Sequence, residues 1–269
     1  MSGKKAINSA TPYLDLSNIY DTFTGKIYTP LSLNIKSLIS GKLLPSTSLF
    51  SQVMISEHTR VVAIIASIRQ DWTERKVYEE ARKIVMAEYQ NIVVKELMPL
   101  LVGKMKADLL TSLHYDENIQ VGLSPEEVVL GLGMVEMFGY QNQLDGAGKG
   151  DLKQSLAMRS STHTKIGFSS NLEMLEQIIS LSQRFGVENW TAVQEKCPML
   201  TFSETALSNP LFSAIQEKPM DGELLGPTFC CFIFQLVARL ISGDKFWFKN
   251  QFSDEQSIAI QSSGMSSLI

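Results

Sequence analysis

The stretch that decides the fold runs from Ser56 to Gly103 and reads SEHTRVVAIIASIRQDWTERKVYEEARKIVMAEYQNIVVKELMPLLVG. After Trp72, apolar side chains recur every three or four residues and polar ones fall between them. This spacing predicts an amphipathic helix with one buried face. The apolar positions are Tyr78, Ala81, Val85, Tyr89 and Ile92, and the polar positions opposite them are Lys76, Glu79, Glu80, Lys83 and Gln90.

A second helix is predicted just before this one. Residues 53–68 are apolar on most sides. Asp71, Trp72 and Thr73 then supply a turn and an N-cap. We therefore expect two long, mostly buried helices at the centre of the molecule, preceded by a long Ser, Thr, Gly and Pro-rich connection over residues 21–52.

Further helices are predicted in the second half of the chain. Ser124 and Glu127 have the spacing of a capping box, and residues 170–184 are amphipathic. Residues 217–248 contain a buried helix of roughly 14 residues, which begins near Thr228 and ends near Gly243. The Ser- and Gln-rich tail after Gln256 is expected to fray.

The composition is that of an ordinary globular protein. The 269 residues are 44% hydrophobic and 19% charged, which suits one compact domain over residues 1–269. A net charge of −4 argues against nucleic acid as a partner. The longest apolar run, residues 229–237, is too short for a membrane span.

The cysteines and the N-terminus bear on the cellular compartment. Of the three cysteines, Cys230 and Cys231 are adjacent, which suggests neither a disulfide framework nor a metal site. We interpret them as buried, unpaired side chains. The first residues, MSGKKAINSATPYLDL, lack the apolar stretch of a secretory signal, so the chain as written is expected to be intracellular.

Several motifs in the opening stretch resemble the animal-type haem peroxidases, such as peroxidasin and myeloperoxidase. These are Glu57-His58-x-Arg60, Trp72, residues 78–85 (YEEARKIV) and residues 99–103 (PLLVG). A second block, residues 217–248, is similar to the family's penultimate helix, with LGPTF at its entry and a Gly-Asp-Lys-Phe-Trp exit. The resemblance is strongest over residues 11–20, 56–103 and 217–248. It implies a mainly α-helical haem-peroxidase-like domain that is truncated at the N-terminus.

The resemblance also implies a calcium loop. Thr11, Tyr13, Asp15 and Ser17 match the family's Thr-x-aromatic-x-Asp-x-Ser segment, in which Tyr13 would contribute only its carbonyl. Oxygen ligands of this kind suit calcium. The family completes the site with an aspartate beside the distal histidine, which comes earlier than the residue where this sequence begins.

The residues that carry the family's haem chemistry are missing from their expected places. No arginine occurs from Met1 to Thr59, so the arginine that polarises the peroxide has no counterpart there. Residues 123–140, where the proximal histidine is expected, contain no histidine. Ala157 stands where the family has the asparagine that orients this ligand. If any histidine binds haem, His163 is the candidate, whereas His58 and His114 are interpreted as structural or surface residues.

Three functions follow from these observations. The resemblance implies a haem-dependent peroxidase that uses hydrogen peroxide and takes part in the response to oxidative stress. The residues favour a haem-free pseudoenzyme that serves as a binding or structural module. A fatty-acid dioxygenase is a further alternative that no motif supports.

Truncation has a consequence for association. If the family's N-terminal portion and haem cover the central helices, then Ile64, Ile65 and Ile68 are partly uncovered in this chain. We therefore expect a marginally stable protein or a homo-oligomer that forms through this face.

Overall fold

The computed structural model describes residues 11–17, 19–20, 45–129, 131, 195, 197 and 217–268. These residues form helices and turns and no strand, which confirms the mainly α-helical prediction. They belong to two compact units. Unit 1 contains the described residues from 97 to 243, and unit 2 contains those from 11 to 96 together with 244–268. The single domain over residues 1–269 stays a prediction.

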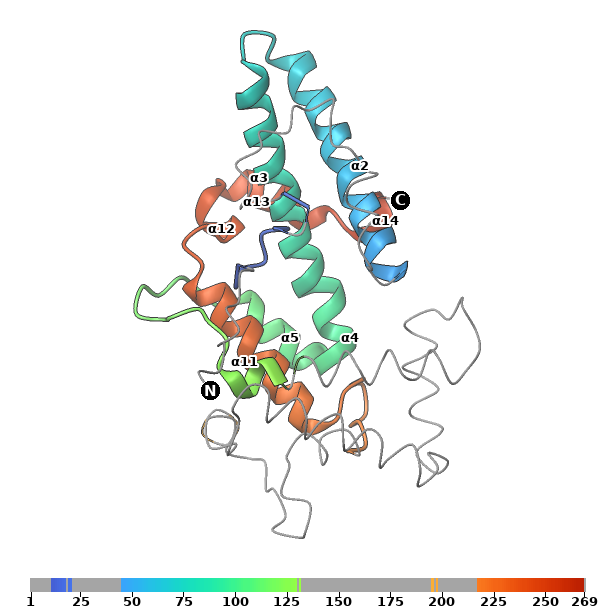
Figure 1. The fold of residues 1–269 in the computed structure, drawn as a ribbon, viewed down its shortest axis with the longest axis vertical. Coiled ribbons are helices and arrows are strands. Elements are labelled where there is room, and N and C mark those ends of the chain that lie inside the picture. Colours follow the sequence, from blue (N-terminus) through green and yellow to red (C-terminus); the bar gives the residue numbers. More distant parts are fainter. Residues whose placement is uncertain are drawn as a thin grey trace, which may run out of the picture. The chain divides into compact units, whose positions relative to one another are not determined.

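Two long helices of unit 2 lie side by side and are joined by a short turn (Figure 1). They are α2 (Pro45–Ile68) and α3 (Glu74–Ile92). Thr73 caps α3 as predicted, because its side-chain oxygen accepts a hydrogen bond from the Lys76 N–H at 3.3 Å. Ala81 and Val85 of α3 are completely buried, which confirms the apolar face read from the sequence.

Helix α2 begins earlier than predicted. The sequence placed residues 45–52 in a long connection, but they are helical. Phe50 packs against Tyr89 of α3, with the two ring centres 5.6 Å apart. This tertiary contact outweighs the loop-like composition of the segment. The predicted connection over residues 21–44 and the predicted helix over 170–184 lie outside the described residues.

Gln90 was assigned to the exposed side of α3, and this prediction is wrong. Its side chain is 3% exposed. The amide nitrogen donates to the Leu14 carbonyl at 3.1 Å, and the amide oxygen accepts from the Phe248 N–H at 3.0 Å. A polar residue can occupy the core when every polar atom finds a partner, and hydrophobic periodicity cannot detect such a case.

The C-terminal segment is ordered, so the prediction that it frays is wrong. It forms α12 (Phe248–Gln251), α13 (Asp254–Ser262) and α14 (Met265–Leu268). Asn91 of α3 donates to the carbonyls of Ile260 and Ser263 at 3.1 and 3.0 Å. Met265 and Leu268 pack against the apolar core of unit 2. These long-range contacts stabilise a segment whose composition alone suggests a flexible tail.

The outer face of α2 exposes large apolar side chains. Ile64 is 44% exposed and Ile68 is 71% exposed, as expected from the sequence. Ile65 is half-buried and packs against the core of unit 2.

Two buried carboxyl groups lie at the contact between α2 and α3. Glu57 accepts two hydrogen bonds from Arg60, at 2.7 and 2.5 Å. Glu88 is 8% exposed. Burial, followed by the charge of Glu57, raises the pKa of Glu88 to about 7.

Helix α3 is followed directly by a π-helical turn, η1 (Val93–Leu97), and by α4 (Met98–Val102). Pro99 has no N–H to donate to the carbonyl four residues earlier, and the helical pattern changes just before it. Gly103 ends α4 with a φ of 82°, a value at which a side chain is strained. It leads into α5 (Lys104–Thr111).

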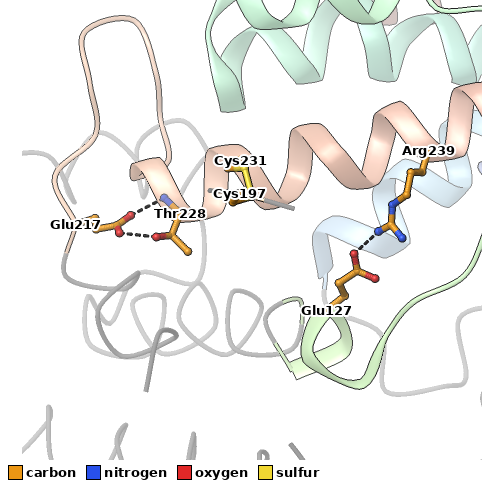
Figure 2. The surroundings of a disulfide bond; sticks show 6 residues. All are labelled: Glu127, Cys197, Glu217, Thr228, Cys231 and Arg239. Carbon is orange, nitrogen blue, oxygen red and sulfur yellow. Dashed lines mark hydrogen bonds and ion pairs between the residues drawn. A yellow bond between two sulfur atoms is a disulfide. The ribbon is translucent and has the colours of Figure 1, made fainter. Parts of the chain in front are cut away.

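In unit 1, α11 (Pro227–Gly243) contacts α4 and α5, and its position confirms the predicted buried helix (Figure 1). The side chain of Glu217 accepts hydrogen bonds at the N-terminus of α11. Figure 2 shows both carboxylate oxygens of Glu217 bonded to Thr228, one to the backbone N–H at 2.7 Å and one to the hydroxyl at 2.5 Å. A carboxylate at this position also interacts favourably with the helix dipole.

The predicted capping box at Ser124 is present. The Ser124 N–H donates to Glu127 at 2.8 Å, and the Glu127 N–H donates to the Ser124 hydroxyl at 3.3 Å. Residues 125–129 are helical. The Glu127 carboxylate also pairs with Arg239 of α11, so the start of this helix is fixed to α11 (Figure 2).

Cys197 and Cys231 form a disulfide bond (Figure 2), so the prediction of unpaired cysteines is wrong for these two residues. They are 34 residues apart, and sequence spacing alone does not reveal that the fold brings them together. Cys230 is a buried free thiol, as predicted. Burial raises its pKa to about 12.

Among the described residues, no helix combines the length and the apolar character that a transmembrane segment needs.

Glu88 should make the stability depend on pH. Its pKa is 4.5 as a free side chain and about 7 when folded, so between these values the folded chain holds a proton that the unfolded chain releases. The contribution of Glu88 to the free energy of unfolding therefore falls as the pH rises from 4.5 to 7, by about 3 kcal/mol. Glu88→Gln should remove this fall and raise the melting temperature at pH 8 but not at pH 4.

Thermal unfolding across this pH range would check the prediction. Glu79→Gln is a matched control, because Glu79 lies on the same helix and is 53% exposed. Wild-type and Glu88→Gln curves that run parallel at every pH would contradict the assignment.

Candidate functional site

The predicted calcium residues converge in unit 2. Thr11 Oγ1 lies 2.9 Å from Asp15 Oδ2 and 3.2 Å from Ser17 Oγ. The Ser17 N–H donates to Asp15 Oδ1 at 3.0 Å. The Tyr13 side chain is 40% exposed, which is compatible with a role for its carbonyl alone. Residues 11–17 therefore form a compact cluster of oxygen atoms, which we call the Thr11–Ser17 loop.

Hydrogen bonds to the carbonyls of Leu14 and Leu16 fix the backbone of the Thr11–Ser17 loop. Leu16 has a φ of 52°, in the left-handed region that few non-glycine residues adopt. Its carbonyl accepts hydrogen bonds from the N–H groups of Ile19 and Tyr20 at 2.8 and 2.9 Å. Gln90, which lies on α3, donates a hydrogen bond to the Leu14 carbonyl. Burial of the Leu16 side chain at 3% exposure and these bonds together offset the backbone strain.

The Thr11–Ser17 loop has the right chemistry for calcium but few charged ligands. Calcium prefers six to eight oxygen atoms, including several carboxylates. Asp15 supplies the one carboxylate among the predicted ligands, and both of its oxygens already accept hydrogen bonds from the loop. No cluster of three or more His, Cys, Asp or Glu residues suited to a metal occurs in the described part of the chain. Among the predicted ligands, the loop thus offers a cation one carboxylate together with hydroxyl and carbonyl oxygens.

His58 lies at the centre of a buried aromatic cluster. Its Nδ1 is 3.0 Å from the hydroxyl of Tyr20, and its ring centre is 4.9 Å from that of Tyr78. The side chain is completely buried. Burial, and then the charge of Arg82, lower the pKa of His58 to about 4, so the imidazole is neutral over the physiological range. These contacts agree with the structural role expected of this residue.

The two described histidines lie in different surroundings. His58 is enclosed by aromatic rings and bonded through Nδ1. His114 is exposed in a segment without regular structure after α5. His163 and Ala157 lie outside the described residues, so the candidate haem ligand stays a prediction.

The family model for animal haem peroxidases matches residues 39–162 and 209–269. The chain belongs to the animal haem peroxidase family. The resemblance read from the motifs is thereby confirmed, and the helical architecture agrees with it.

Several relatives in this family are similar to parts of the chain. Peroxidase mlt-7 of Caenorhabditis elegans is 23% identical over 275 residues, which cover 79% of this chain and 38% of the relative. Chorion peroxidase of Aedes aegypti is 36% identical over 76 residues, or 25% of this chain and 10% of the relative. Peroxidasin homolog pxn-1 of C. elegans is 20% identical and covers 94% of this chain and 28% of the relative. The chain thus spans less than two fifths of the length of these relatives.

Sequence reasoning missed the residues that position the Thr11–Ser17 loop. Gln90 joins the loop to α3 and α12, and Tyr20 joins its end to His58. For Gln90, the sequence offered no signal, because helical periodicity assigns a polar residue at this position to the exposed side. For Tyr20, the four-residue spacing from Leu16 placed it on the same side of the turn.

We expect added calcium to raise the melting temperature little, because one carboxylate binds calcium weakly. Calcium at 100 times its dissociation constant would stabilise the fold by about 2.7 kcal/mol. A shift of that size at micromolar calcium, lost in Asp15→Ala, would contradict the expectation. Asp108→Ala is a suitable control, since Asp108 is 59% exposed and pairs with Lys104 on α5.

Proposed function

We propose that this member of the peroxidase family does not catalyse haem-dependent peroxide chemistry and acts as a binding or structural module. The observation that carries the proposal is the lack of any histidine in residues 123–140, where the family has its iron ligand. Peroxidase chemistry requires an axial ligand for the iron, a base for the peroxide proton and a cation that polarises the O–O bond.

The arginine that polarises the peroxide also lacks a counterpart in its expected segment. No arginine precedes Arg60, and Lys36 and Lys42 cannot reproduce its planar, two-pronged geometry. Arg60 itself is bound to Glu57 within α2. His58 is neutral and hydrogen-bonded to Tyr20. These contacts support structural roles for both residues.

Catalytically active peroxidase remains the second candidate. The names of the relatives favour it, because mlt-7 and the chorion protein of Aedes aegypti are called peroxidases. In that case His163 is the candidate haem ligand. A fatty-acid dioxygenase has no specific observation in its favour.

Mixing the purified chain with haemin separates these functions. We expect no sharp Soret band of a histidine-ligated haem, because the proximal histidine is missing from its expected segment. A clean band that disappears in His163→Ala but persists in His114→Ala would overturn the proposal and support the peroxidase. His114 is the matched control because it is exposed.

We also propose that the chain folds in an oxidising compartment, in place of the intracellular location expected from its N-terminus. Disulfides persist mainly in extracellular and secretory environments, and Cys197 is bonded to Cys231. Protein isolated from its source without reductant should then show one free thiol per chain after denaturation, that of Cys230. Three free thiols would contradict this proposal.

The exposed face of α2 supports the proposed homo-oligomer. Ile64 and Ile68 are one helical turn apart and both contact solvent. Sedimentation at micromolar concentration should reveal a dimer that dissociates in Ile68→Glu. Ile258→Glu should leave the dimer intact, because Ile258 is similarly exposed at 67% but lies on α13. A compact wild-type monomer that melts cooperatively above about 60 °C would refute the idea.

A further inference from the structure

Two buried nitrogen atoms in unit 2 have no hydrogen-bond partner. They are Nε2 of His58 and Nε of Arg82. The His58 side chain is completely buried. Buried polar atoms in folded proteins are nearly always paired, so two unpaired nitrogens in one cluster indicate a missing acceptor.

Both side chains pack against Tyr20. The Tyr20 hydroxyl lies 3.0 Å from His58 Nδ1, and the guanidinium carbon of Arg82 lies 5.1 Å from the centre of the Tyr20 ring. Burial raises the pKa of Tyr20, so the hydroxyl keeps its proton, and we assign this proton to the hydrogen bond with Nδ1. The neutral imidazole then carries its own proton on Nε2. Both unpaired nitrogens are therefore N–H donors.

The positive charge of Arg82 is not balanced by a nearby carboxylate of the described residues. Glu57 already has a counter-charge, because it accepts two hydrogen bonds from Arg60. Glu88, with a pKa of about 7, is mostly protonated at pH 6. No carboxylate of the described residues lies within ion-pair distance of Arg82. A half-buried guanidinium without a counter-charge is unfavourable, and one bound anion would neutralise it.

We propose that His58, Arg82 and Tyr20 form a binding site for one small monovalent anion of about the size of chloride. The anion accepts one hydrogen bond from His58 Nε2 and one from Arg82 Nε. The ring of Tyr78, centred 4.9 Å from that of His58, packs against the same cluster. This site is separate from the Thr11–Ser17 loop, and it does not depend on whether the chain binds haem.

The test compares thermal unfolding of the full chain at pH 6 in sodium chloride and in sodium gluconate of equal ionic strength, because gluconate is too large for the site. The melting temperature should be higher in chloride, by about 3 °C when chloride exceeds its dissociation constant tenfold. Arg82→Gln should abolish this difference. Arg75→Gln should retain it, since Arg75 is 73% exposed and pairs with Glu79 on the same helix.

A second measurement uses the unaltered protein, so it decides the question even if Arg82→Gln fails to fold. In ¹⁵N NMR spectra, His58 Nε2 should be protonated and its resonance should shift when chloride replaces gluconate. Equal melting temperatures together with an unchanged resonance would mean that only water occupies the site, which overturns the proposal. A chloride effect that survives Arg82→Gln would place the anion elsewhere and also overturn it.

Discussion

The arrangement of unit 2 depends on one buried amide, that of Gln90. Its nitrogen holds the carbonyl of Leu14, 76 positions away in sequence, and its oxygen holds the N–H of Phe248, 158 positions away. A primary amide supplies both a donor and an acceptor from one neutral group, so a single side chain satisfies both backbone groups. Loss of either bond would leave a buried backbone group unpaired. The Thr11–Ser17 loop and α12 are thus both positioned from α3.

The α2–α3 contact contains ionisable groups that are kept neutral in opposite ways. His58 loses its proton because burial and Arg82 disfavour the charged imidazole, whereas Glu88 retains its proton because burial and Glu57 disfavour the carboxylate. The contribution of His58 to the free energy of unfolding is complete above pH 6.5 and is lost as the pH falls towards 4. The contribution of Glu88 to the same free energy decreases as the pH rises from 4.5 to 7. Between pH 4.5 and 6.5 the two effects oppose each other. The interior is thereby protected from large changes in stability across mildly acidic conditions.

The helices were predictable where their sequence signals are local. Periodic apolar residues indicated the buried face of α3, and Thr73 and Ser124 showed the capping chemistry that the structure contains. Long-range features were not predictable in this way. The helical start at Pro45 depends on packing against α3, and the ordered C-terminus depends on hydrogen bonds from Asn91. For the candidate site, the motif indicated the convergence of Thr11, Asp15 and Ser17, but not the supports from Gln90 and Tyr20.

The bond between Cys197 and Cys231 also affects how the chain responds to proteases. Because the two sulfur atoms close a covalent loop, a single cut in the backbone between these residues would leave the two fragments attached. The nicked protein would migrate as two pieces only after reduction. The carboxyl-terminal fragment would contain the end of α11 together with α12, α13 and α14. Proteolysis in this interval would therefore change the connectivity of the chain without releasing the segment that completes unit 2.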